Sequence, residues 1–243
     1  MPTQTPVPRL LAIQLAIARA GSLSVREISA LTGIPQSAVY RKLDALVDAG
    51  LVNRGPRRGQ FCCGAESLRF AESYRREALA NSPITTHLRR AAESSGELAA
   101  YLIPSGTEAL CVESAEGRHI LRCSYSPGRA QPLTRGASAL AILAFLQPAD
   151  ARDILAALHV QSSGKQALFR QLEQVRAHRY AMSDSELDEG VWGASAPVFS
   201  GSGNLTGVVT IMAPSVRAEQ RQDELISQAQ LTAADLTSAL EPT

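Results

Sequence analysis

The stretch LSVREISALTGIPQSAVYRKLDALVDAGLVNRGPRRGQFCCG, residues 23–64, decides the fold class of the N-terminal region. Ser24 and Glu27 near its start form a capping box, because the serine hydroxyl can accept from the third amide of a helix while the glutamate reaches back to the first. This pattern predicts a short helix that begins directly after the serine. Its inward-facing positions are expected to be Val25, Ile28 and Leu31.

A second helix is predicted after a glycine-containing break at Thr32-Gly33. Pro35 suits the first helical position, where no backbone donor is required, and the helix is expected to run to about Ala49 and to end at Gly50. Two short helices around such a turn are typical of a helix-turn-helix, whose second helix can lie in the DNA major groove.

The outward face of this second helix carries groups that suit DNA. Its buried stripe is predicted to be Val39, Leu43, Leu46 and Val47. The opposite face and its flanks carry Gln36, Ser37, Tyr40, Arg41 and Lys42. Asp44 and Asp48 lie further along the outer face, where a carboxylate would repel phosphate. Base recognition is therefore expected from the first two turns.

A hairpin is predicted after the second helix. LVNR and QFCCG form two short strands around the turn Gly55-Pro56-Arg57-Arg58-Gly59, which gives the wing of a winged helix-turn-helix. The alternative is that these arginines are ordinary solvated loop charges. Cys62 and Cys63 occupy adjacent strand positions, so we expect one of them to pack inward. A further helix is predicted upstream, from about Leu10 to Gly21.

The formal net charge of the 243 residues is +1, an average of two different parts. Residues 1–64 carry eight basic and three acidic side chains, a net charge of +5, while the rest carries 16 basic and 20 acidic ones, a net charge of −4. A basic head suits nucleic acid, whereas a mildly acidic body does not. The length also favours two domains over one.

The body is predicted to combine helices with a mainly antiparallel sheet, an α+β ligand domain. Strands are expected at 109–114, 118–125 and 207–212, the last one buried and central. Helices are expected at 138–146 and 166–178 and along the apolar repeat Leu225, Ala229, Ala233, Leu236 and Leu240. Residues 65–83 predict a linker helix that is interrupted near Pro83.

Several other classes of protein lack support in the sequence. The opening ten residues do not resemble a secretion signal, and the longest apolar run, 139–146, is far shorter than the roughly 20 residues of a membrane span. The four cysteines and four histidines show no zinc spacing. We therefore expect a cytoplasmic protein with no metal, no cofactor and no membrane partner.

The stretch from Leu23 to Arg54, with the glycine at Gly64, resembles the winged helix-turn-helix of the IclR family of bacterial transcriptional regulators. The Thr-Gly-Ile-Pro turn, the Ser-Ala-Val start and Arg41 match the family's recognition helix. RYAMSDSELDEGVWGASAPVFSGSGNLTGVVTIMAP, from Arg179, looks like the family's effector-domain signature, and PLTRGASALAILAF, from Pro132, occupies the place of its Pro-Leu-His-Ala segment. The resemblance covers nearly the whole chain.

This resemblance implies three parts, namely a winged helix-turn-helix DNA-binding domain (1–64), a linker helix (65–83) and a GAF-like effector-binding domain (84–243). It also implies the partners, which are a palindromic site in double-stranded promoter DNA, a small-molecule effector and further copies of the chain as a homodimer or a dimer of dimers. The expected function is ligand-responsive regulation of a catabolic operon.

The resemblance further implies an effector site for a small carboxylate. The family's backbone-amide positions fall at Ala137 and Ser138, its acid at Ser183 with Asp184 next to it, its cysteine at Gly193, its two hydroxyls at Thr210 and Met212, and a wall position at Cys123. Free amides at a helix start bind anions, although Ser138 is as readily a helix cap. The chain has Ser183 in place of the family's acid, Gly193 in place of its cysteine and Met212 in place of one hydroxyl. These differences predict a larger and less polar pocket, and an aromatic or otherwise larger organic acid as the effector.

Three alternatives stay open at this point. Trp192 and Arg135 could supply an aromatic wall and a cation, or be a packed tryptophan and a surface arginine. A thiol-based redox sensor could use Cys111 or Cys123, or the wing cysteines. A hydrolytic enzyme would need a nucleophile elbow, a zinc motif or a phosphate loop, and the sequence contains none of these patterns, so no catalytic residue is assigned.

Overall fold

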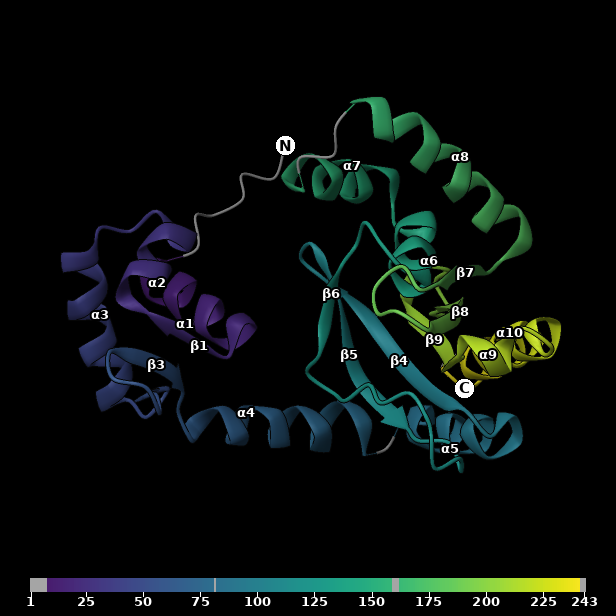
Figure 1. Ribbon diagram of the computed structural model, residues 1–243, viewed down its shortest axis with the longest axis horizontal. Helices are drawn as coiled ribbons and strands as arrows, with labels where there is room; N and C mark the ends of the chain where they lie inside the picture. Colours follow the sequence, from purple (N-terminus) through teal and green to yellow (C-terminus); the bar gives the residue numbers. More distant parts are fainter. Residues whose placement is uncertain (1–7, 81, 159–161, 241–243) are drawn as a thin grey trace. The chain divides into compact units, whose positions relative to one another are not determined.

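A computed structural model of the chain describes residues 8–80, 82–158 and 162–240 (Figure 1). The chain divides into two compact units, residues 1–81 and 82–243. The first unit combines helices with a three-stranded sheet, and the second is built around a six-stranded sheet.

The first unit has the predicted helices and hairpin. Its elements are α1 (Arg9–Ala20), β1 (Ser22–Ser24), α2 (Val25–Thr32), α3 (Gln36–Asp48), β2 (Val52–Arg54), β3 (Gln60–Cys63) and α4 (Glu66–Tyr74), which continues as a π-helical turn over Arg75–Leu79. The capping box is confirmed, since the Ser24 amide donates to Glu27 Oε2 at 2.7 Å and the Glu27 amide to Ser24 Oγ at 3.3 Å. The structure thus confirms the two predicted helices, α2 and α3, and the predicted hairpin of β2 and β3.

The small sheet of this unit has the order β1-β3-β2, and both of its pairs are antiparallel. The sequence pattern did not predict β1, because a strand of three residues is too short to show alternation. The core under the sheet consists of Ile13, Ile17, Leu23, Val25, Ile28, Ile34, Val39, Leu43, Leu46, Val52 and Phe61. Cys63 packs against this core, as expected for one of the two adjacent cysteines.

One predicted core position of α2 is wrong. Leu31 is 65% exposed, whereas Val25 and Ile28 are buried. At about 100° per residue, Leu31 lies roughly 240° around the helix from Val25, which carries it past the edge of the buried face. Thr32 completes that face instead, and its hydroxyl donates to the Ile28 carbonyl at 2.7 Å.

The second unit contains six antiparallel strands in the order β6-β5-β4-β9-β8-β7. The strands are β4 (Leu98–Ser105), β5 (Glu108–Ala115), β6 (Ala130–Pro132), β7 (Ala181–Asp184), β8 (Val191–Phe199) and β9 (Leu205–Pro214). The helices are α5 (Ile84–Ser95), α6 (Ala137–Phe145), α7 (Pro148–Ala157), α8 (Ser162–His178), α9 (Ser215–Ala218) and α10 (Gln222–Ala239). The buried, central position predicted for 207–212 is confirmed in β9.

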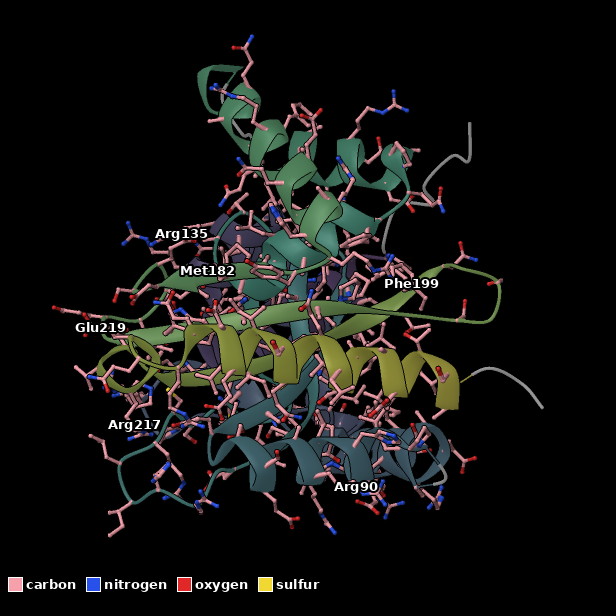
Figure 2. All side chains as sticks on the ribbon, turned by 90° about the vertical axis from the view of Figure 1, so that its right-hand side faces the viewer. Arg90, Arg135, Met182, Phe199, Arg217 and Glu219 are labelled. Carbon is pink, nitrogen blue, oxygen red and sulfur yellow. The ribbon has the colours of Figure 1, made fainter. Side chains whose placement is uncertain are left out.

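Helices cover both faces of this sheet. Figure 2 views the unit nearly edge-on to the strands, with α6 and α8 on one side of the sheet and α10 and α5 on the other. The apolar repeat of α10 faces the strands, since Leu225, Ala229, Ala233 and Leu236 are buried. The fold is therefore α+β, with three layers.

The strand predicted at 118–125 is wrong. Residues 116–129 contain no helix or strand, and Ile120 and Leu121 are 99% and 71% exposed. The sheet is instead extended beyond β5 by β6, which pairs with residues 108–110. Residues 118–125 pair with no strand of this sheet.

Candidate functional site

The first unit exposes the polar side chains that the sequence assigned to DNA. Gln36, Ser37, Tyr40 and Arg41 are exposed on α3, and Lys42 is half-buried. Arg57 and Arg58 are exposed in the turn between β2 and β3. The turn is closed by the Gly55 amide, which donates to the Gln60 carbonyl at 2.7 Å. The helix and the hairpin thus present cations and hydrogen-bonding groups to solvent.

The second unit has a cavity of about 230 Å³ beside the start of α6. It is lined by Tyr125, Arg129, Ala130, Gln131, Pro132, Ala137, Ser138, Ser183, Leu187, Asp188, Val191, Gly193, Thr210 and Met212. Six of the eight positions that the family resemblance assigned to the effector are in this lining. They are Ala137, Ser138, Ser183, Gly193, Thr210 and Met212.

The register of the sheet brings these positions together. Ser183 pairs with Gly193, and Gly193 with Met212, so the three form one row across β7, β8 and β9. Ser195 pairs with Thr210 in the row two residues along, which projects from the same face of the sheet. That face is covered by α6, whose first turn closes the cavity.

Three buried hydroxyls form a cluster at the inner end of the cavity. Thr210 Oγ1 lies 3.0 Å from Ser138 Oγ and 2.8 Å from Ser195 Oγ, and Ser195 Oγ lies 3.4 Å from Ser138 Oγ. The Ser138 hydroxyl is thus bound to strand β9, and the helix N-cap is Gly136, so the alternative role of Ser138 as a cap does not hold.

The amides that begin α6 already have partners within the chain. The Gly136 amide donates to Glu186 Oε2 at 2.9 Å, and the Ala137 amide donates to Ser183 Oγ at 3.0 Å. Arg135 donates to the Glu186 main-chain carbonyl. These contacts fix the loop between β7 and β8 against the helix, so that Leu187 and Asp188 become part of the cavity wall.

Several wall residues were not assigned from the sequence. Tyr125 and Arg129 come from the segment between β5 and β6, and Gln131 lies on β6. The Tyr125 hydroxyl donates to Gln131 Oε1 at 3.4 Å, and the Arg129 guanidinium lies 5.2 Å from the centre of the tyrosine ring. Burial raises the pKa of Tyr125 to about 12, so the ring stays neutral near pH 7. No motif links these residues, and the fold alone brings them to the cavity.

Two assigned positions lie outside the lining. Asp184 follows Ser183 on β7 and projects from the other face of the sheet, where it accepts from the Ser215 hydroxyl at 2.6 Å. Cys123 is half-buried against the core of the unit. Trp192 is fully buried and is likewise not a wall residue, because it adjoins Gly193 and projects from the opposite face. The Arg135 guanidinium donates to the Glu186 carbonyl, and Arg135 does not line the cavity.

Two of the four cysteines of the redox alternative, Cys111 and Cys123, form thiolates only at high pH. Burial raises the pKa of Cys111 to about 12 and, with the negative charge of Glu97 adding to it, the pKa of Cys123 to about 11. A thiol sensor reacts as the thiolate, so these shifts work against the chemistry it needs.

Within residues 8–80, 82–158 and 162–240, no cluster of histidine, cysteine and acidic side chains could hold a metal ion. Nor is any helix of that part of the chain both long and apolar enough to cross a membrane.

Known families match both units. The family described as bacterial transcriptional regulator IclR C-terminal matches residues 78–238, and the family described as bacterial regulatory protein, arsR family, matches residues 10–54. The first match alone covers more than half of the chain, and the second covers the helix-turn-helix.

Individual relatives agree with these families. The HTH-type transcriptional regulator BhcR of Paracoccus denitrificans is 25% identical over 241 residues, which cover 96% of this chain and 86% of the relative. A C-terminal domain from Vibrio cholerae is 36% identical with a TM-score of 0.60 and covers 66% of this chain and 98% of its own. An IclR family transcriptional regulator from Brucella abortus, 18% identical, shares the fold with a TM-score of 0.81 over 96% of this chain and 93% of its own. The chain therefore belongs to the IclR family of bacterial transcriptional regulators, DNA-binding proteins that respond to a ligand.

Proposed function

We propose that residues 84–243 bind a small organic acid in the cavity beside α6, that residues 1–64 bind double-stranded promoter DNA, and that residues 65–83 link them. The observation that carries the ligand proposal is the cavity itself, in which a buried hydroxyl cluster and a helix start share the wall with apolar side chains and with the polar Arg129, Gln131 and Asp188. Such a site orients a ligand with one polar end.

The carboxylate of the acid would face the start of α6. The helix N-terminus carries partial positive charge, and the hydroxyls of Ser138 and Thr210 can donate to an anion. Ser183 adds a third donor, because a hydroxyl that accepts from the Ala137 amide at 3.0 Å can still give its own proton to a ligand. A carboxylate is thereby held without a buried lysine or arginine.

The body of the acid would face Met212, Val191, Leu187 and the Tyr125 ring. Gly193 contributes no side chain to this wall, so the cavity has room beside it. We therefore propose an aromatic acid, or another acid larger than one of two or three carbons. Cys123 and Asp184, which do not line the cavity, are not proposed to contact the acid.

The DNA proposal assigns separate roles to the helix and the wing. The first turns of α3 would enter the major groove with Gln36, Ser37, Tyr40, Arg41 and Lys42, while Arg57 and Arg58 would contact phosphates or the minor groove. Leu68, Phe70 and Tyr74 are 74%, 65% and 45% exposed on α4, and these apolar side chains support pairing of two copies. A homodimer, or a dimer of dimers, would then occupy a palindromic site.

The protein would act in the cytoplasm as a regulator of a catabolic operon, by binding and not by catalysis. Calorimetry with glyoxylate, pyruvate, benzoate, 4-hydroxybenzoate and the neutral analogue benzamide tests the ligand proposal. We expect the aromatic acids to bind most tightly and benzamide to bind weakly. Tight binding of the two smallest acids alone, or of benzamide alone, would overturn it.

A further inference from the structure

One wall of the cavity comes from a segment that lacks regular structure. Residues 116–129 connect β5 to β6 and carry Tyr125 and Arg129 into the lining. Its ends are tied by the main chain, since the Cys111 amide donates to the Arg129 carbonyl at 2.8 Å and Gly117 packs directly against Gly96. In the described chain, no hydrogen bond between backbone groups holds residues 118–125.

The middle of this segment is held by a side chain from a distant element. Arg217 on α9 donates through Nη1 to the Leu121 carbonyl at 2.9 Å. The same guanidinium donates through Nε and Nη2 to the two carboxylate oxygens of Glu97, at 2.7 and 2.8 Å. One planar group therefore joins the segment to the start of β4. Figure 2 shows Arg217 at the end of the unit where Arg135, beside the cavity, also lies.

The Glu97 carboxylate that Arg217 binds is itself held in place. Its side chain is fully buried, and it also lies 3.7 Å from Arg221 Nη1 and 3.9 Å from His119 Nε2. A buried carboxylate needs cationic partners in good geometry, and a bidentate arginine supplies both charge and direction. Arg217 is thus restrained by a group that cannot move to solvent without a large penalty.

We propose that Arg217 is a positioning residue of the effector pocket: by binding Glu97 and the Leu121 carbonyl together, it sets where the Tyr125 wall stands. The inference rests on the proposed function, because the wall matters only if the cavity binds a ligand. Arg217 itself does not line the cavity, so it would not touch a ligand bound there.

The test compares Arg217→Lys with Arg221→Lys. Lysine keeps a positive charge beside Glu97 but lacks the fork that reaches two acceptors at once. Arg221 is a matched control, because it lies near the same carboxylate and donates to the Ser95 carbonyl at 2.9 Å, outside the segment. The measurements are the rate of tryptic cleavage of ligand-free protein after Arg118 and Arg122, and calorimetry with the acid of the panel that wild-type protein binds best.

We expect Arg217→Lys to raise the rate of tryptic cleavage after Arg118 and Arg122 by about tenfold or more, because a protease cuts a segment that is locally released, and to weaken acid binding by about fivefold or more. Arg221→Lys should change neither by more than about twofold. A wild-type cleavage rate in Arg217→Lys, or faster cleavage with unchanged affinity, would overturn the positioning role.

Failure of the proposed function looks different. If wild-type protein binds no acid, the ligand proposal fails, and the contact of Arg217 with the segment is judged on the cleavage rate alone, where an unchanged rate overturns its role. If Arg217→Lys does not fold, the double variant Glu97→Gln with Arg217→Gln replaces the buried ion pair by a neutral one and still removes the fork. A wild-type rate of cleavage after Arg118 and Arg122 in that variant would equally overturn the role of Arg217.

Discussion

Gly193 on β8 lies directly opposite Met212 on β9, so a wall position without a side chain adjoins a flexible apolar one. A Cβ added at Gly193 would lie 3.7 Å from the Ile211 carbonyl oxygen and 3.9 Å from Met212 Cγ, which is ordinary contact. The backbone here thus accepts larger residues, and the space they would fill belongs to the cavity.

Gly193→Val should therefore fold and discriminate between acids. We expect benzoate to bind about tenfold more weakly, because the added methyl groups occupy its space, while glyoxylate binding stays within about twofold. Calorimetry measures both, with Gly193→Ala as an intermediate step. Equal loss for both acids would show that the volume beside Gly193 does not select the ligand.

Thr210→Val removes the hydroxyl at the centre of the buried cluster and preserves the shape of the side chain. Ser138 and Ser195 then lose a shared partner, so the free energy of unfolding should fall by about 1–3 kcal/mol, and acid affinity should fall by about tenfold as a donor is lost. Urea titration and calorimetry measure the two effects. Thr206→Val on the same strand is the control, since its hydroxyl donates to the Val198 carbonyl outside the cavity; if it weakens acid binding equally, the cluster has no special role.

Arg58→Ala and Arg41→Ala should affect DNA binding in different ways. Loss of a wing cation should weaken binding to all sequences and reduce the slope of log K against log salt by about one. Arg41→Ala should also relax sequence preference, because α3 is placed to read bases. Mobility-shift titrations at several salt concentrations measure this. Arg90→Ala removes an exposed arginine on α5 and controls for the change in net charge (Figure 2). Wild-type DNA binding by both Arg58→Ala and Arg41→Ala would contradict the assignment of α3 and the wing to DNA.

Alkylation of Cys123 by iodoacetamide should be slow near pH 7 and rise toward pH 11, because its pKa is raised to about 11 by burial and by Glu97. An acid whose pKa is raised on folding keeps its proton when the unfolded chain, near 9.0, has lost it. Its contribution to stability is therefore complete below pH 9 and is lost as the pH rises to about 11. Peptide mapping by mass spectrometry measures the labelling. Rapid labelling at pH 7 would revive a redox role.

Local patterns predicted the first unit well. The capping box at Ser24 and the Gly33–Pro35 break are contained within a few residues, and the structure confirms α2 and α3 around them. The error at Leu31 arose because a spacing of three residues is less than one helical turn. Along Val25, Ile28 and Leu31, each residue is therefore displaced around the helix from the one before it, and the third no longer lies on the buried face.

The second unit was less predictable, because its contacts join distant parts of the chain. The alternation in 118–125 suggested a strand, yet the segment is bound by Arg217, almost a hundred residues away, and not by a neighbouring strand. Asp184 was assigned to the site, and Trp192 was left open as a wall residue or a packed tryptophan, because each adjoins a site position in the sequence. Strand alternation turns both away from the cavity. Tyr125 and Asp188 carry no sequence signal for a site, since only the folded loops bring them there.

The sheet of the second unit also acts as a partition. The cavity lies on the α6 face, whereas α5, the helix that follows the linker in the chain, packs on the opposite face against β4 and β5. Successive side chains of a strand project from opposite faces, so a signal from a ligand in the cavity would reach α5 through the strand backbone or around the ends of the strands. One strand end lies at Glu97, between the end of α5 and the start of β4, and Arg217 joins this end to the segment that carries Tyr125.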